Sequence, residues 1–255
     1  MQYLKLSVEN FVAVVTMDAP PVNAVSAGFM EEMVAVFDKI SDLDDARVVV
    51  LTGAGKIFCA GADIKNRAGK VFEPGERWAH SRRARELGYS IMECKKPVIA
   101  AINGPALGAG LGIAVCCDIL LCSENASLGL PEVDVGLMGG GRHAMRVCGH
   151  SLTRRMMLTG DRIAGPELYR RGIVEACVPL EELMPAAMAM AARIASKSPI
   201  ASRTAKHCAA TIENMTLRDG YRFEQNMTAE LGQTEDSREA MRAFVEKRVP
   251  VFVGR

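Results

Sequence analysis

The sequence lacks the features of several common protein classes. It has no run near the roughly 18 apolar residues that a membrane-spanning helix needs. Its opening, MQYLKLSVEN, lacks the apolar core and cleavage site of a secretory signal. The 31 basic residues nearly balance the 30 acidic ones, so no strong field favours nucleic acid or an anionic membrane. These absences predict a cytoplasmic protein that binds neither nucleic acid nor membranes.

Cysteine is present, but not in a metal or disulfide pattern. None of the eight cysteines follows C-x-x-C spacing, and most lie in apolar runs. The adjacent Cys116 and Cys117 would point to different sides of any regular element, which argues against their binding one ion. We therefore expect buried, reduced thiols and no metal.

The length and the residue patterns predict an α/β fold. A chain of 255 residues can form one large domain that buries roughly 70–75% of its unfolded surface. The β-rich runs 3–8 and 11–17 predict a hairpin, and Ser26 is placed to cap a helix. Buried strands are expected at 47–55 and 96–104, each followed by a glycine turn.

The second half of the chain becomes progressively helical. Further elements are expected as a helix from about Glu76, short strands at 118–122 and 126–129, helices from about 139 and 151, a strand at 173–178, and helices from Leu180 onward. This order predicts an α/β core over 1–195 and a helical region over 196–255 that packs on the core or on another subunit.

Two glycine-rich turns are candidate binding loops, LTGAGKIFCAGADIK (51–65) and GPALGAGLG (104–112). The second follows a strand and precedes a helix, so a dinucleotide site is one alternative, although its third glycine is displaced from the required spacing. A P-loop is excluded because no Lys-Ser or Lys-Thr follows the glycines. A serine-hydrolase elbow is absent because GHSLT ends in threonine.

Small residues let two backbone segments approach one ligand closely, each offering an N–H group. Such paired donors suit a carbonyl oxygen that becomes negative during a reaction, and the loss of one donor typically costs about 2.7–4 kcal/mol. The two turns together therefore predict an oxyanion hole, whereas either alone would be interpreted as a tight turn at a strand end.

Several motifs in order resemble the crotonase, or enoyl-CoA hydratase/isomerase, superfamily. They are FCAGADIK, KPVIAAINGPALGAGLGIAVCCDI, LGLPEVDVGL, LTGDRI, GIVEACV and REAMRAFVEKRVPVF. The resemblance covers nearly the whole chain and is weakest over about 66–90. It implies a crotonase-like spiral of ββα units, C-terminal trimerisation helices, and homotrimers or dimers of trimers. It also implies acyl-CoA thioester substrates, with coenzyme A entering as part of the substrate and no separate cofactor.

The resemblance assigns roles to particular residues. By position, the two N–H donors would be Ala60 and Ala109, and Glu132 would be the catalytic acid/base. Removal of a proton beside a thioester needs such a base, and a glutamate suits this role if burial raises its pKa. The residues expected to contact the substrate are Lys56, Ala62, Asp63, Ile64, Gly108, Gly112, Pro131 and Gly140.

Gly112 departs from the pattern of the hydratases of this superfamily, which typically carry a second glutamate at that position. A single Glu132 can still move a proton between C2 and C4 of an enoyl chain. Isomerase-type chemistry is therefore slightly favoured over plain hydration. Lyase or thioester hydrolase chemistry on the same fold stays open, as does a non-catalytic binding module.

Other polar residues have open roles. Asp134 would share a side with Glu132 if that segment were extended, although a solvated carboxylate is the simpler interpretation. His143 follows GGGR at an expected helix start and could approach the site. Lys206, from a C-terminal helix, could meet the phosphates of coenzyme A.

Overall fold

A six-stranded sheet runs through the centre of the computed structural model, which describes residues 1–64 and 71–255. The strands lie in the order β1-β2-β3-β4-β6-β9, and only β1 and β2 are antiparallel to each other. Their bounds are β1 Leu4–Glu9, β2 Val12–Met17, β3 Val48–Gly53, β4 Val98–Ile102, β6 Ile119–Ser123 and β9 Ala176–Val178. The predicted hairpin is confirmed, and its turn residues Asn10 and Phe11 have φ of 51° and 64°. Such positive φ values at both central residues match the twist of a two-residue hairpin.

A second, three-stranded sheet has the order β5-β7-β8. Its strands are β5 Pro105–Leu107, β7 Ser127–Gly129 and β8 Arg162–Ala164. The sequence did not predict β5 or β8, because three residues are too few to show an alternating pattern. Since β5 follows β4 and belongs to this other sheet, the chain lacks the direct strand–loop–helix connection of a dinucleotide site. That alternative is therefore wrong.

The helices follow the predicted order closely. They are α1 Ala27–Asp42, α2 Glu76–Met92, α3 Ala109–Val115, α4 Gly141–Thr159, α5 Gly165–Arg170, α6 Leu180–Ala195, α7 Pro199–Ile212, α8 Leu217–Leu231 and α9 Glu235–Glu246. The Ser26 hydroxyl caps α1 by accepting a hydrogen bond from Phe29 N at 3.2 Å. Within α4, Gly149 has φ 71° and ψ 176°, so the two predicted helices are halves of one kinked element. No helix of the described residues combines the length and apolarity that a bilayer crossing requires.

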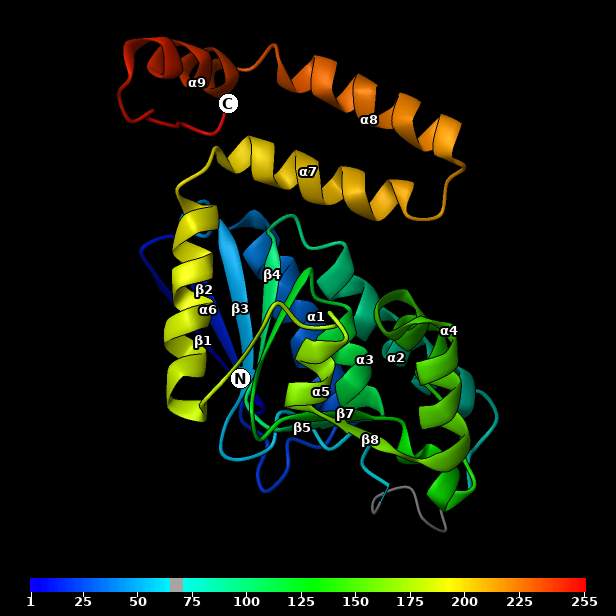
Figure 1. Cartoon of the computed structure of the whole chain (residues 1–255). Coiled ribbons are helices and arrows are strands. Elements are labelled where there is room, and N and C mark those ends of the chain that lie inside the picture. Colours follow the sequence, from blue (N-terminus) through cyan, green and yellow to red (C-terminus); the bar gives the residue numbers. More distant parts are fainter. Residues whose placement is uncertain (65–70) are drawn as a thin grey trace.

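The central sheet is covered on both faces, as its alternating side chains require. Val49 and Leu51 of β3 belong to the core on the side of α1, and Val48 and Val50 pack in the core on the side of α6. Figure 1 shows α6 along one side of the sheet, with α7, α8 and α9 across one end of the molecule. The chain therefore has a layered α/β body with an added helical layer.

Lys206 anchors this added layer to the body. Its buried ammonium group donates hydrogen bonds to the carbonyl oxygens of Ile91 at 3.0 Å and Lys96 at 3.1 Å. It also forms an ion pair with Asp118 Oδ2 at 2.9 Å. The hypothesis that Lys206 meets a phosphate does not fit this arrangement, because its charge is already paired inside the protein.

Replacing Lys206 with methionine should destabilise the chain substantially. K206M would keep the packing of the methylene stem but leave the Ile91 and Lys96 carbonyl oxygens without their buried donor, at a cost of about 1–3 kcal/mol. Chemical denaturation measures this loss in the free energy of unfolding. K39M is the matched control, because Lys39 is exposed in the last turn of α1. Equal stability of the two variants would contradict the anchoring role.

Candidate active site

The two glycine turns lie against each other at the end of the central sheet. Cys59 N donates to Pro105 O at 3.2 Å, and Leu107 N donates to Cys59 O at 2.9 Å. Gly61 has φ 97°, and a Cβ atom there would lie 2.7 Å from Leu107 O and 3.5 Å from Ala109 N. A Cβ atom at Gly110 would collide with the Cys59 carbonyl. The two segments can be this close only because both positions lack a side chain.

The N–H group of Ala60 is not available to a substrate in this arrangement. It donates a hydrogen bond to Val22 O at 3.0 Å. The assignment of Ala60 as an oxyanion donor therefore needs correction. The positive φ of Gly61 turns the chain directly after Ala60, and neither composition nor spacing revealed that turn.

The N–H group of Ala62, unlike that of Ala60, is not used in a hydrogen bond with the described residues. Gly61 O accepts from Val25 N at 2.8 Å, and Asp63 N donates to Val25 O at 3.2 Å, which forms a parallel bridge between Val25 and Ala62. In such a bridge the N–H group of the central residue points away from its partner strand. Ala62 N has no acceptor among the described residues.

Ala109 N is the second unpaired donor. Ala109 is the first residue of α3, and the first N–H groups of a helix have no intrahelical acceptor. Gly108 precedes it with φ 55° and is held to the second sheet by a hydrogen bond from Gly108 N to Gly129 O at 2.9 Å. The alanine side chain does not hinder this presentation, because Ala109 already lies within the helix.

Glu132 lies beside these donors. Pro131 begins the short 3₁₀ helix η1, Pro131–Val135, which carries the Glu132 side chain toward Gly108. A Cβ atom at Gly108 would lie 2.5 Å from Glu132 Oε1, and one at Gly139 would lie 3.7 Å from it. Gly140 adopts φ 71°, and a Cβ atom there would press on Leu130 at 2.8 Å. The absence of a side chain at Gly108 leaves the room that the carboxyl group occupies.

The Glu132 carboxyl group is only weakly solvated. Its Oε2 atom is buried and has no hydrogen-bond partner among the described residues. Burial raises the pKa of Glu132 above the ordinary 4.5, against the smaller lowering effect of its own backbone N–H. A carboxyl group with a raised pKa and a free oxygen is suited to accept and return a proton near neutral pH.

Asp134 does not join Glu132. The segment is a 3₁₀ helix and not extended, so residues two apart do not share a side. The Asp134 carboxylate is exposed and lies against Gly160, where a Cβ atom would be 2.8 Å from its Oδ1. The shared-side alternative is therefore wrong, and the solvated interpretation fits.

Gly112 faces open space. A Cβ atom built there would meet nothing within 4 Å, in contrast to Gly108 and Gly110. Gly112 follows Ala109 by three residues on α3, so both lie on the same side of that helix. The position of the missing second carboxylate therefore has room for a substrate or for water.

A cavity of about 760 Å³ borders the Ala62 turn. It is lined by Ala60, Ala62, Asp63 and Ile64, together with the loop that joins β2 to α1 and residues of the N-terminus. Lys56 is exposed on the turn after β3 and is not among these lining residues. Residue 65, the last of the FCAGADIK motif, lies outside the described residues, as do residues 66–70.

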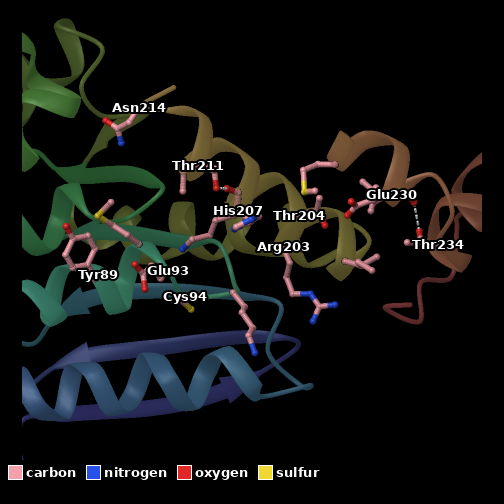
Figure 2. A pocket seen from close by; sticks show the side chains of 17 residues that line it. Tyr89, Glu93, Cys94, Arg203, Thr204, His207, Thr211, Asn214, Glu230 and Thr234 are labelled. Atoms are coloured by element: carbon pink, nitrogen blue, oxygen red, sulfur yellow. Dashed lines mark hydrogen bonds between the residues drawn. The ribbon is translucent and has the colours of Figure 1, made fainter. Parts of the chain in front are cut away.

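A groove of similar size, about 770 Å³, lies between the end of α2 and the helices α7 and α8. Figure 2 shows Arg203, Thr204 and His207 of α7 in it, opposite Tyr89 and Glu93. It contains neither of the two unpaired donors nor Glu132. We therefore take Ala62, Ala109 and Glu132 as the candidate active site.

The site offers two kinds of protein group for chemistry. Two main-chain N–H groups can bind an oxygen, and one carboxyl group can exchange a proton with an atom bonded near that oxygen. Within residues 1–64 and 71–255, no group of three or more His, Cys, Asp or Glu side chains is placed to hold a metal ion.

Comparisons with known proteins agree with this geometry. The family model described as enoyl-CoA hydratase/isomerase matches residues 7–255. A probable mitochondrial enoyl-CoA hydratase of Dictyostelium discoideum is 36% identical over 94% of this chain and 87% of its own length. The 2,3-dehydroadipyl-CoA hydratase of Escherichia coli is 32% identical, with full coverage of both chains. The crystal structure of an enoyl-CoA hydratase from Bacillus anthracis has a TM-score of 0.94 and 33% identity, also with full coverage.

Replacing Glu132 with glutamine should stabilise the protein, and more so as the pH rises. A group whose pKa is raised by folding contributes stability below its unfolded pKa, and this contribution is lost as the pH rises through the folded pKa. At about pH 8 the buried charge therefore costs about 1.4 kcal/mol for each unit of pKa shift, and E132Q removes this cost. Melting temperatures at about pH 5 and pH 8 measure the effect. A difference between the two proteins that is independent of pH would contradict the burial of this charge.

Proposed function

Because the chain belongs to the enoyl-CoA hydratase/isomerase family, we propose that its Glu132 site moves a proton within the acyl group of an acyl-CoA thioester. The observation that carries the proposal is the Glu132 carboxyl group beside Gly108, whose Oε2 atom is buried and has no hydrogen-bond partner among the described residues. The thioester oxygen would lie between Ala62 N and Ala109 N. The carbon beside the thioester would then face Glu132.

In the proposed reaction Glu132 takes a proton from C2 of a 3-enoyl-CoA. The electron pair of the broken C–H bond spreads into the thioester, whose oxygen becomes negative. The two N–H groups bind this oxygen more strongly in the dienolate than in the substrate, which lowers the barrier. The Glu132 carboxyl group then returns the proton at C4, and the product is the conjugated 2-enoyl-CoA.

Gly112 supports isomerisation over hydration. Hydration adds water across the double bond, and a second carboxylate would help to orient that water. At Gly112 the chain has open space in place of such a group. A single carboxyl group that transfers one proton from C2 to C4 needs no second carboxylate.

Hydration is the second candidate, and the comparisons favour it. The similar proteins from Dictyostelium discoideum and Escherichia coli are both named as hydratases. A water molecule could occupy the open space at Gly112 and be oriented by Glu132 alone.

The cavity beside Ala62 would hold the coenzyme A moiety. It borders the proposed oxyanion donor, and Asp63 and Ile64 line it directly. In this proposal the carrier would lie beside Ala62, and the acyl chain would extend toward Gly112.

Product analysis tests the proposed reaction. With a 3-enoyl-CoA, the wild-type protein should form the conjugated 2-enoyl-CoA, detected by its ultraviolet absorbance and by mass spectrometry. E132Q should lower kcat about 10²–10⁴-fold with little change in KM. Wild-type kcat/KM should fall as the pH drops through the raised pKa of Glu132, because the base must be ionised. Free coenzyme A or a shortened acyl product would contradict the proposal, and a 3-hydroxyacyl product would favour the hydratase candidate.

Proline at position 109 tests the oxyanion donor. Proline is well tolerated at the first position of a helix, so A109P removes one N–H group with little effect on α3. We expect kcat/KM to fall about 10²–10³-fold. The control is L217P, because Leu217 is the first residue of α8 and is 91% exposed. Equal activity of the two variants would show that Ala109 N does not bind the oxygen.

We also propose that the chain assembles as a homotrimer through its C-terminal helices. Tyr221 of α8 and Phe244 and Val245 of α9 are exposed, and Phe244 reaches 85%. In Figure 1 these helices lie apart from the central sheet. Large apolar side chains gathered on one surface indicate a protein interface.

Size-exclusion chromatography with light scattering tests the assembly. The wild-type protein should elute with the mass of three chains, and F244E should reduce that mass by placing a charge in the interface. Leu158 is also exposed, but it lies on α4 outside the C-terminal helices, so L158E is the matched control and should keep the trimer. A monomeric wild-type protein would contradict the proposal.

A further inference from the structure

Two of the eight free cysteines lie side by side on neighbouring strands. Cys122 of β6 and Cys177 of β9 are Cα partners in the parallel register of these strands. Both side chains join the core on the α1 side of the sheet, whereas Leu121 and Ala176 belong with the core on the α6 side. Partner residues that share a face of a sheet have adjacent side chains. The two thiols are therefore neighbours.

Gly165, the first residue of α5, lies against both sulfur atoms. A Cβ atom there would be 3.2 Å from Cys177 Sγ and 3.3 Å from Cys122 Sγ. Burial is the main cause that raises the pKa of Cys122, and the charge of Cys177 and a hydrogen bond between the two thiols add to this. The two sulfur atoms thus meet in one place beneath the start of α5.

The backbone at this pair suits a disulfide. Neighbouring strands lie about 4.7–4.9 Å apart, which falls within the roughly 4.4–6.8 Å that separate the Cα atoms of a disulfide. The strand β9 is three residues long and lies at the edge of the sheet. A small shift of this short strand would bring the two Cβ atoms to the closer spacing that the bond needs. A disulfide can therefore form without rearrangement of the sheet.

The two thiols differ in their access to solvent. Cys177 is half-buried and Cys122 is buried, so a small oxidant reaches Cys177 first. Cys148 is also half-buried, but burial alone raises its pKa to about 11, with no contribution from another thiol. Cys117 is buried, and its thiol donates to Ile113 O at 3.5 Å. The pair on β6 and β9 thus combines a partly exposed thiol with a second thiol beside it.

We propose that Cys122 and Cys177 form a modification site, at which hydrogen peroxide converts the two thiols to an intrachain disulfide between β6 and β9. This inference rests on the geometry of β6, β9 and α5, and it is independent of the proposed reaction at Glu132. In a reducing compartment such a bond is transient and responds to the oxidant.

The chemistry consumes one peroxide for each disulfide. The Cys177 sulfur attacks one oxygen of hydrogen peroxide, the O–O bond breaks, one water leaves, and Cys177 becomes a sulfenic acid. The Cys122 sulfur then attacks the Cys177 sulfur, and the sulfenic hydroxyl leaves with the Cys122 proton as a second water. Two thiols are oxidised to one disulfide, and the peroxide is reduced to two waters.

The bond would close a long segment of the chain. The residues between Cys122 and Cys177 include β7, η1 with Glu132, α4 and α5. A cross-link between the ends of this segment restricts the unfolded chain, which stabilises the folded one. The melting temperature of the oxidised protein should therefore rise by a few degrees and return to its former value with dithiothreitol. An unchanged or lower melting temperature would contradict a bond that fits the native strands.

Peptide mapping and thiol counting test the site directly. After treatment with a small excess of hydrogen peroxide, the wild-type protein should lose two of its eight thiols, and mass spectrometry should find Cys122 linked to Cys177. C177S should form no such link and keep its thiols. C148S is the matched control, because Cys148 is half-buried as well, and it should still lose two thiols.

The order of the two steps is tested with dimedone, which traps sulfenic acids. In C122A the oxidised Cys177 has no thiol beside it, so a dimedone adduct should accumulate at Cys177. In C177S we expect no adduct at Cys122, because that thiol is buried.

The absence of the Cys122–Cys177 link in the wild-type protein would overturn the proposal, as would an equal loss of thiols in C177S or a link between Cys94 and Cys117 in its place. The wild-type map requires no substitution, so it decides the proposal even where a variant fails to fold.

Discussion

The site depends on the contact between two backbone segments that have no side chains between them. Gly61 lies against the Leu107 carbonyl and Gly110 lies against the Cys59 carbonyl, at distances that a Cβ atom would not allow. This contact holds the turn after Phe58 beside the start of α3. It therefore sets the spacing between Ala62 N and Ala109 N, and a larger residue at either glycine would push the two donors apart.

The Glu132 carboxyl group is held in an environment that does not stabilise its charge. Gly108 makes room for the Glu132 side chain, whose Oε2 atom has no hydrogen-bond partner among the described residues. A well-paired carboxylate would be more stable but a weaker base, because each hydrogen bond to the charged form lowers its pKa. The low stability of the ionised group is thus part of what makes it suitable for proton transfer.

The helical layer serves a different purpose from the site. Lys206 fastens α7 to the ends of α2 and β4 through buried polar contacts, and α8 and α9 then present apolar side chains to the outside. The body of the fold therefore carries the candidate active site, and the added helices expose apolar side chains.

The amino-acid pattern by itself predicted most of the helices, the central strands and the pairing of two small-residue turns. Each of these follows from local periodicity or from residues whose chemistry is distinctive. The order of the motifs identified the family, and the resemblance to that family pointed to Glu132. Four features were decided only by the tertiary structure. Positive φ at Gly61 made Ala62, and not Ala60, the free donor, and the 3₁₀ turn separated Asp134 from Glu132. The three-residue strand β5 excluded a dinucleotide loop, and burial withdrew Lys206 from solvent. Each of these features depends on backbone angles and on neighbours that are distant in the sequence. The spacing of residues along the chain contains no information on those angles or neighbours.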